Sequence, residues 1–477
     1  MLGNEYVELR KPIVFFYRTL YGAYLYSANL DAISQISDNT YYELERAFRG
    51  CVDDKIKLEK NPEIDVLIRR GFFSERRVEE LYHPQVEIMR DFSERALPSI
   101  TLQVTQNCNL RCRYCIYSEK INQGQRSHSP RRMKLETSLK AIDFLYEHSI
   151  DSETVNIGFY GGEPLLEFDL IKKVVSYADE RFRGRKHTFS ITTNATLLDL
   201  EKYTYMDSHD FSITISMDGD RETHNRNRIF SHSQIGSFDA IIQNIQKIEE
   251  RFPDVAKKIS ISAVVDANSP LRWSQDLDNE YERYLENTNA GIAETDDPNE
   301  DTFSPEFSEM YQYICFIDLR RCYKKIKSKH KIPPICRQQF NYMQRDFSML
   351  GGNGALPKIG APSGPCMPGL FRLFVDVDGN FLPCERVSEQ SSIMRIGSLE
   401  KGFLFDKMAE LLNFSKDHEK CKICPAFRHC GICAKFCDGG DALSKSAYEK
   451  ACHNAYENFK LKLKYWSLFY SGPMVYT

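Results

Sequence analysis

The chain from residue 97 to residue 265 alternates between short apolar, β-branched runs and longer amphipathic runs. The short runs predict strands at residues 100–104, 154–160, 188–192, 211–216 and 259–265. The longer runs predict helices at residues 135–149, 168–182, 198–209 and 238–252. Alternating strands and helices form βαβ units, whose strands are parallel and covered by the helices. The alternation therefore predicts an α/β fold built on a parallel sheet.

Conspicuous polar motifs follow four of these expected strands. In chain order, they are the cysteine loop 108–115, Gly161-Gly162-Glu163-Pro164, Thr193-Asn194 and Ser216-Met217-Asp218-Gly219. The loops that leave the carboxyl ends of parallel strands gather on one face of the sheet and build the site there. We therefore expect the four motifs to converge on one site.

Three cysteines, Cys108, Cys112 and Cys115, stand in the pattern Cys-x3-Cys-x2-Cys. A cluster of four irons held by three thiolates keeps one iron open for a substrate or cofactor. A structural zinc site needs four ligands, and the nearest further candidate is His128, in a polar loop. The spacing favours an iron-sulfur cluster that does chemistry, with zinc as the alternative.

The composition limits the class of protein. A chain of 477 residues is long enough for two or three domains, and its net charge of -4 gives no bulk attraction to nucleic acid or a membrane surface. Residues 1–11 show no apolar signal segment, and no run is long enough to span a membrane. Eleven of the fifteen cysteines lie in two clusters, which in a reducing compartment indicates metal ligands. We expect a cytoplasmic protein.

The first 95 residues predict a small, winged-helix-like domain of strands and helices. Residues 13–20 and 23–27 are aromatic and β-branched runs around a Tyr21-Gly22 turn, which indicates a hairpin. Residues 37–40 are typical of a helix cap before residues 41–48, and residues 64–70 predict a second helix that ends at Gly71.

The carboxyl-terminal part holds eight further clustered cysteines. They are Cys366, Cys384, Cys421, Cys424, Cys430, Cys433, Cys437 and Cys452. Eight thiols satisfy two fully ligated four-iron clusters or two zinc sites equally well. Residues 374–383, centred on Asp378-Gly379, predict a hairpin that presents Cys384.

The chain between these two parts has weaker signals. Residues 288–301 are acidic and turn-rich, which favours an exposed insertion. Residues 303–329 predict a helix, and the Gly- and Pro-rich residues 351–368 predict a linker.

The cysteine loop, with Tyr114 as the aromatic residue before its third cysteine, resembles the signature of the radical S-adenosylmethionine (SAM) enzymes. The resemblance implies a partial (β/α)6 TIM-like barrel over residues 96–300, in which one 4Fe-4S cluster and SAM generate a 5'-deoxyadenosyl radical. It also implies that Gly161, Gly162, Glu163 and Pro164 contact the amino group of SAM, while Thr193, Asn194, Ser216 and Asp218 reach its ribose and carboxylate. Arg228, in a stretch that resembles the family's H-D-x-x-R motif with Asn225 in place of Asp, would be a carboxylate partner.

The carboxyl-terminal cysteines resemble the SPASM domain, an extension of radical SAM enzymes that act on peptides. The resemblance implies a SPASM domain over residues 361–477, after bridging helices at 301–360, with two auxiliary 4Fe-4S clusters. One would take Cys421, Cys424, Cys430 and Cys452, and the other Cys366 and Cys384 with Cys433 or Cys437. Glu385 matches an acidic residue that serves as a base in sulfatase-maturing relatives, although an exposed hairpin carboxylate is the simpler interpretation.

Residues 1–95 are similar to the leader-peptide recognition element of peptide-modifying enzymes. The combination implies an enzyme that forms Cys sulfur-to-carbon thioethers of the sactipeptide or ranthipeptide type, such as freyrasin, in a ribosomally made precursor peptide with a leader. A flavodoxin or ferredoxin would supply electrons. The alternatives are formylglycine formation as in sulfatase maturases, carbon-carbon cross-linking, and a zinc-stabilised peptide-binding protein without chemistry.

Overall fold

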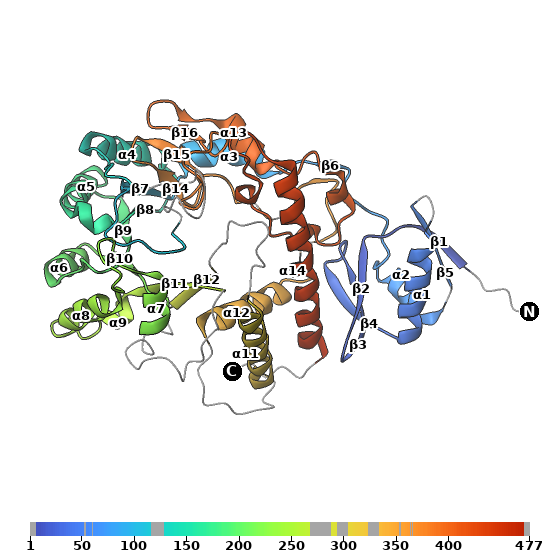
Figure 1. Ribbon diagram of the computed structural model, residues 1–477. Coiled ribbons are helices and arrows are strands. Elements are labelled where there is room, and N and C mark those ends of the chain that lie inside the picture. Colours follow the sequence, from blue (N-terminus) through green and yellow to red (C-terminus); the bar gives the residue numbers. More distant parts are fainter. Residues whose placement is uncertain are drawn as a thin grey trace, which may run out of the picture.

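The computed structural model describes residues 6–51, 54–59, 61–115, 128–267, 288–292, 304–322, 333–352, 354–362, 364 and 366–471. Figure 1 shows a curved sheet with helices on its outer side, a small sheet domain at the amino-terminal end, and the long helix α14 (Lys445–Ser471) between them. Among the described residues, no helix is long and apolar enough to cross a membrane.

The central sheet contains ten strands in the order β12-β11-β10-β9-β8-β7-β14-β15-β16-β17. Its first six strands are β7 (Ser99–Thr105), β8 (Thr154–Gly161), β9 (Lys186–Thr193), β10 (Phe211–Ser216), β11 (Ser260–Val265) and β12 (Thr288–Ile292). Each of these pairs in parallel with its neighbour. The five strands expected from the sequence are therefore confirmed, and their parallel pairing gives the predicted α/β sheet.

The sixth parallel strand corrects the expectation of an exposed insertion at residues 288–301. Thr288 is buried and pairs with Ile261, and the ladder continues to the end of β12. This strand, Thr-Asn-Ala-Gly-Ile, consists mostly of small residues, so the sequence has no β-branched run to mark it. The ladder with β11 holds it at the edge of the sheet. Residues 293–301 lie outside the described chain.

Four helices cover the outer side of the parallel strands (Figure 1). They are α4 (Leu135–His148), α5 (Phe168–Arg181), α6 (Leu200–Ser208) and α8 (Phe238–Glu249), close to the four helices expected. Their apolar faces and the strands form one core, in which Ile157, Val174 and Ile241 are fully buried. Burying such a side chain stabilises the fold by roughly 1.5–3 kcal/mol. The same core also includes residues of the carboxyl-terminal region, such as Phe374 and Met408.

The sheet continues into the carboxyl-terminal region. Strand β14 (Leu373–Val375) pairs in parallel with β7, and β15 (Asn380–Leu382) returns antiparallel, which confirms the predicted hairpin. Two short strands, β16 (Gly397–Ser398) and β17 (Gly402–Phe403), complete the sheet. One backbone ladder thus joins the barrel to the region that carries the later cysteines.

Buried side chains reinforce this connection. The amides of Gln103, in β7, and Gln106 donate to the two carboxylate oxygens of Glu389. The Gln103 side-chain oxygen also accepts a hydrogen bond from the Val377 amide at 3.1 Å. The segment that leads into the first cysteine loop is therefore hydrogen-bonded to two parts of the carboxyl-terminal region, at Val377 and at Glu389.

The amino-terminal domain contains the antiparallel sheet β2-β3-β4 and a separate pair, β1 with β5. Its elements are β1 (Tyr6–Arg10), β2 (Val14–Thr19), β3 (Gly22–Ser27), β4 (Ala32–Ile36), α1 (Asp38–Arg49), β5 (Lys55–Glu59) and α2 (Pro62–Arg69). The hairpin around Tyr21-Gly22 is confirmed, and Ser37 caps α1 by accepting from the Thr40 amide. The comparison with a winged helix stays a prediction.

The amino-terminal sheet docks on the carboxyl-terminal region. Tyr17 and Tyr26 belong to the same buried cluster as Phe459 and Trp466 of α14. The Tyr17 hydroxyl donates to the Leu463 carbonyl at 2.8 Å. The amino-terminal sheet therefore shares a core with the carboxyl-terminal region and is not an independent domain joined only by a linker.

The remaining elements connect these parts. They are β6 (Glu80–Leu81), α3 (Gln85–Arg95), α7 (Arg221–Asn227), α9 (Val255–Lys258), α11 (Pro305–Cys322), α12 (Pro334–Ser348), β13 (Ile359–Gly360) and α13 (Phe405–Leu412). Helix α11 confirms the helix expected within residues 303–329, of which 303 and 323–329 lie outside the described chain. Strand β13 pairs with β6, so the expected linker also carries a strand.

A pair of isoleucines tests the core of the barrel. We expect Ile157→Ala, at a fully buried position, to lower the free energy of unfolding by roughly 2–5 kcal/mol because it leaves a cavity. The matched control Ile150→Ala, at a position 61% exposed, should change it by less than about 0.5 kcal/mol. Denaturant unfolding followed by far-UV circular dichroism measures both, and equal shifts would contradict this assignment of the core.

Candidate active site

The first cysteine loop follows β7 and is tied to the segment after α7. The Arg111 amide donates to the Ile229 carbonyl at 2.8 Å, and the Arg113 amide donates to the Asn227 carbonyl at 3.0 Å. The Cys108 sulfur accepts from the Leu110 amide at 3.4 Å. These bonds hold the loop in one conformation over the ends of the strands.

The three thiols of this loop form an electrostatically coupled group. Burial raises the pKa of Cys112 to about 12, opposed by the nearby Arg228 guanidinium. Burial also raises the pKa of Cys108, and the negative charges of Glu163, Cys112 and Cys115 add to the rise. A buried thiol with a high pKa loses its proton when its sulfur binds a metal ion. The donor set therefore suits a metal cluster.

The histidine considered as a fourth ligand lies beside this group. His128 Nε2 is 4.0 Å from the Cys115 sulfur, and burial lowers the imidazole pKa to about 4. Among the residues that the structure describes, no three His, Cys, Asp or Glu side chains form a group that could hold a single metal ion.

The glycines that follow β8 let two loops lie against each other. A Cβ atom on Gly161 would stand 2.2 Å from the Thr105 carbonyl oxygen, and one on Gly162 would stand 2.2 Å from that of Asn107. The Gly162 amide donates to the Thr105 carbonyl, and the Glu163 amide donates to the Asn107 carbonyl, both at 2.9 Å. Gly161 also has a φ of +141°, which favours glycine. The glycines thus fit the backbone of the cysteine loop directly.

Glu163 joins the second and third strand ends. Its fully buried carboxylate accepts from the Thr193 hydroxyl at 2.6 Å, the Asn194 amide at 2.7 Å and the Leu165 amide at 3.0 Å. Burial raises its pKa to about 6. Pro164 begins the short 3-10 helix Pro164–Glu167 that follows. The structure therefore places this carboxylate among protein donors, and its expected contact with a ligand amino group stays a prediction.

Asn194 continues the connection toward the cysteines. Its side-chain amide donates to the Asn109 side-chain oxygen at 2.9 Å and lies 3.8 Å from the Cys108 sulfur. Its side-chain oxygen accepts from the Thr196 amide at 3.0 Å. The third strand end is therefore in direct contact with the cysteine loop, as the convergence of motifs predicts.

The fourth strand end contributes a buried ion pair. Ser216 ends β10, and Asp218 follows it. Arg228 holds the Asp218 carboxylate with two bonds of 2.9 and 3.0 Å, and the Tyr114 hydroxyl donates to the same carboxylate. The Arg228 guanidinium also lies over the Tyr114 ring, 5.4 Å from its centroid. Tyr114 thereby connects the cysteine loop to the fourth strand end.

Arg228, which the sequence suggests as a partner for a ligand carboxylate, is paired with a carboxylate of the chain itself, and its contact with a ligand stays a prediction. The guanidinium fork faces Asp218, and the Val264 amide adds a further donor to that carboxylate at 2.9 Å. A buried arginine without a counter-charge would cost several kcal/mol, so pairing with a neighbouring aspartate is the favourable arrangement. His224 supports the turn by bonding the Ser237 hydroxyl at 2.8 Å.

The later cysteines form two groups. In the first group, the charges of Cys421, Cys430 and Cys452 act on Cys424, whose pKa burial raises to about 12. Its member Cys421 lies 2.9 Å from the Tyr448 hydroxyl of α14. The second group contains Cys366, Cys384 and Cys433, which act on one another in the same way.

Glu385 is not brought to the first cysteine loop. Its carboxylate pairs with Arg372, and Arg386 lies 3.7 Å away. The register sets Leu373 opposite Ile100, and β15 runs back toward that end. Cys384 and Glu385 therefore lie toward the amino end of β7, whereas the first cysteine loop follows its carboxyl end.

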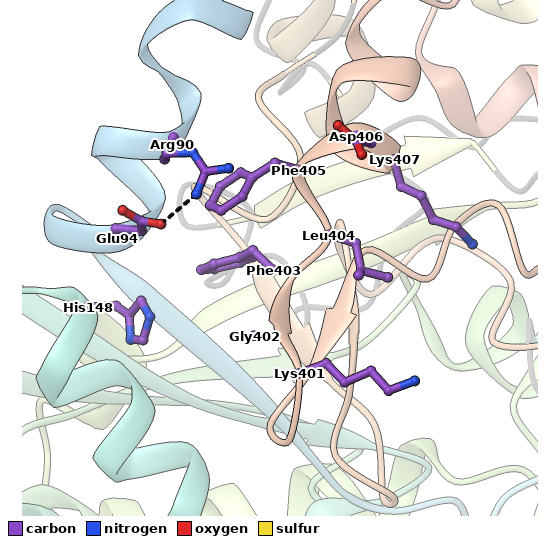
Figure 2. Close-up of a pocket in the computed structure, with 10 residues that line it drawn as sticks. All are labelled: Arg90, Glu94, His148, Lys401, Gly402, Phe403, Leu404, Phe405, Asp406 and Lys407. Carbon is purple, nitrogen blue, oxygen red and sulfur yellow. Dashed lines mark hydrogen bonds and ion pairs between the residues drawn. The ribbon is translucent and has the colours of Figure 1, made fainter.

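A cavity of about 610 Å³ lies apart from all these residues (Figure 2). It opens between α3, the end of α4 at His148, and residues 401–407. Arg90 bonds Glu94 at 3.1 Å and lies 4.0 Å from the centroid of the Phe405 ring. Because α4 ends close to the amino end of β8, this cavity lies near the amino ends of the strands, whereas the motifs lie at their carboxyl ends.

Comparisons with known proteins cover the part of the chain that carries the strand-end motifs. Residues 102–265 match the radical SAM superfamily. An uncharacterised protein of Methanocaldococcus jannaschii is 36% identical over 120 residues, which are 25% of this chain and 38% of that relative. A cysteine-type anaerobic sulfatase-maturating enzyme of Clostridium perfringens is 25% identical over 404 residues, which are 78% of this chain and 95% of that enzyme.

The solved structure of native anSMEcpe with bound AdoMet shares the fold. It has a TM-score of 0.52 and 18% sequence identity, and it covers 77% of this chain and 99% of its own. The chain therefore contains a domain, over residues 102–265, that matches the radical SAM superfamily. That superfamily implies SAM and a 4Fe-4S cluster, and the three coupled, buried thiols after β7 fit such a cluster.

The glycine contact with the cysteine loop can be tested directly. We expect Gly162→Ala to displace Asn107 and lower the iron content by about four irons per chain, because the new Cβ would overlap the loop backbone. The control Gly291→Ala, at an open position in β12, should keep the wild-type iron content. Iron analysis after anaerobic purification measures both, and full iron in Gly162→Ala would contradict the arrangement.

The buried ion pair predicts a stability difference between two arginines of the same turn. Arg228→Met should lower the free energy of unfolding by roughly 3–5 kcal/mol because it leaves Asp218 buried without its counter-charge. Arg226→Met, which removes an exposed pair with Glu222, should cost less than about 0.5 kcal/mol. Denaturant unfolding of the metal-free proteins compares them. A small effect at both positions would show that the pair is not buried in solution.

Proposed function

We propose that the chain is a radical SAM peptide maturase that installs thioether cross-links between cysteine sulfur and carbon in a ribosomally made precursor peptide. The observation that carries the proposal is the physical continuity of its three parts. The radical SAM domain shares one sheet with a cysteine-rich region, and a small amino-terminal sheet docks on that region.

The strand-end residues would hold the cofactors. Cys108, Cys112 and Cys115 would bind the cluster, which, together with SAM, supplies a 5'-deoxyadenosyl radical. The backbone of Gly161 and Gly162, with the side chains of Thr193, Asn194 and Ser216, would line the SAM site. Glu163 and Asp218 position these loops relative to one another, since Glu163 accepts from the Asn194 amide and Asp218 accepts from the Val264 amide, each on the neighbouring strand end. Arg228 supports this arrangement through its ion pair with Asp218. Tyr114 completes this support from the cysteine loop.

The amino-terminal domain would recognise a leader segment of the precursor. Its three-stranded sheet has outer strands β2 and β4, and an extended peptide can add to such an edge through main-chain hydrogen bonds. One face of this sheet packs against α14, so a leader bound at an edge would be held beside the cysteine-rich region.

The cysteine-rich region would hold two auxiliary 4Fe-4S clusters. Formation of one thioether removes a hydrogen from the thiol and one from the acceptor carbon, so electrons must leave the substrate. One-electron carriers close to the substrate suit that task. A flavodoxin or ferredoxin would supply the electron that starts each turnover, and Glu385, if the substrate reaches it, would accept a proton.

A second function is favoured by the relatives. The enzyme of Clostridium perfringens is named a cysteine-type sulfatase-maturating enzyme, and its similarity extends over 78% of this chain. Oxidation of a cysteine or serine to formylglycine by this chain is therefore the second candidate. It would leave no cross-link in the product.

The proposal is tested with the precursor peptide encoded near the gene, the reconstituted protein, SAM and dithionite. We expect formation of 5'-deoxyadenosine and a peptide that loses two hydrogens and one alkylatable thiol for each bridge. Cys112→Ala should form neither product, because its cluster lacks a ligand. A peptide that gains an aldehyde supports the second candidate, and the absence of 5'-deoxyadenosine with the wild-type protein rejects both.

A further inference from the structure

We infer that Cys366, Cys384 and Cys433 form a three-thiol metal site, that Cys437 is a core residue outside it, and that one iron of the cluster is left open to an external thiolate. This inference rests on the proposed function, because it concerns one of the two auxiliary clusters. Sequence spacing leaves Cys433 and Cys437 equivalent candidates, whereas the packing around them separates the two.

Gly364, two residues before Cys366, lies directly against Ile432, the residue before Cys433. A Cβ atom on Gly364 would stand 1.9 Å from the Ile432 carbonyl oxygen, and 2.8 Å from its carbonyl carbon and amide nitrogen. Only a glycine permits so close an approach of two backbones. Cys366 is two residues beyond this contact and Cys433 is one residue beyond it, so the two thiols are carried by adjoining segments.

The same turn also reaches Cys384. The Gly369 amide donates to the Pro383 carbonyl at 3.3 Å, which places the residues after Cys366 beside the residue before Cys384. Gly364 and Gly369, on either side of Cys366, are therefore in contact with the two other segments. These two backbone contacts place the three thiols on adjoining segments, which agrees with one shared site.

Cys437 points into a different environment. It is 1% exposed and belongs to the cluster of Phe427, Tyr448 and Trp466, which packs under α14. Its sulfur is 4.0 Å from the Cys433 carbonyl oxygen. The helical turn Ala434–Cys437 lies between two cores, since Ala434 belongs to the buried cluster against which Cys384 packs. The turn thus directs Cys437 away from the Cys384 side.

The other cysteines with described side chains are accounted for elsewhere. Cys315 and Cys336 pack together beside β12, and Cys51 lies in the amino-terminal domain. The remaining ones belong to the first cysteine loop, residues 108–115, or to the group of Cys421, Cys424, Cys430 and Cys452. Three thiols bind three irons of a four-iron cluster, so one iron has no cysteine from this set. Iron in such clusters prefers soft sulfur ligands, and a thiol that binds releases its proton to water without a change of oxidation state.

The ligand assignment is tested by iron analysis of three proteins purified anaerobically: wild type, Cys433→Ala and Cys437→Ala. Wild type should hold about twelve irons, Cys437→Ala about twelve, and Cys433→Ala about eight. Loss of about four irons in Cys437→Ala, with or without loss in Cys433→Ala, would overturn the inference. Cys437→Val keeps the core filled, so retention of iron there supports the assignment if the alanine variant fails to fold. A wild type with four irons or fewer would instead reject the proposed auxiliary clusters.

The open iron is tested separately in a variant whose Cys108, Cys112 and Cys115 are all alanine, so that only the auxiliary clusters remain. Addition of β-mercaptoethanol should change the electron paramagnetic resonance spectrum of the reduced clusters. The same addition after Cys433→Ala is introduced should give no such change, because that site is lost. An unchanged spectrum in the first protein would show that the fourth iron is already ligated.

Discussion

The backbone ladder of β7 is the constraint on which the rest of the molecule depends. This one strand pairs in parallel with β8 on one side and with β14 on the other. The first pairing brings the glycine loop to the cysteine loop, and the second attaches the carboxyl-terminal region. Because hydrogen-bonded register leaves no freedom to slide, both cysteine regions are set relative to one strand. The buried bonds from Gln103 and Gln106 to Glu389 then fix the end of that strand.

Much of this architecture could be predicted from the sequence. The parallel strands from β7 to β11 are apolar and β-branched, and motifs at their ends converge because chain direction alone places them on one face. The strand β12 does not stand out in the sequence because its residues are mostly small, and its ladder with β11 defines it. The strands β14 to β17 are two or three residues long, too short for any periodic pattern to show their place in the sheet.

The location of the candidate site could be predicted from the sequence, but most of the contacts between its residues could not. Gly161 and Gly162 indicate a close approach, but the sequence does not say that the Thr105–Asn107 backbone is what approaches. Arg228 suits any carboxylate, and the structure supplies one from Asp218, ten residues earlier. Gln103 and Glu389 had one available signal, a polar residue inside an apolar strand, which requires a buried partner. That partner comes from a distant part of the chain, so no local pattern reveals it.

The docking of the amino-terminal sheet has a consequence for distance. Asp31, just before β4, bonds His429 at 2.6 Å, and Arg428 donates to the Ala28 carbonyl at 2.9 Å, so the sheet and the turn that leads to Cys430 move together. The distance between the amino-terminal sheet and the cysteine-rich region is therefore constant. For a peptide anchored on the sheet, each residue of spacer adds at most about 3.3–3.6 Å of reach. The number of residues between anchor and target would then select which position of the peptide arrives at the chemistry.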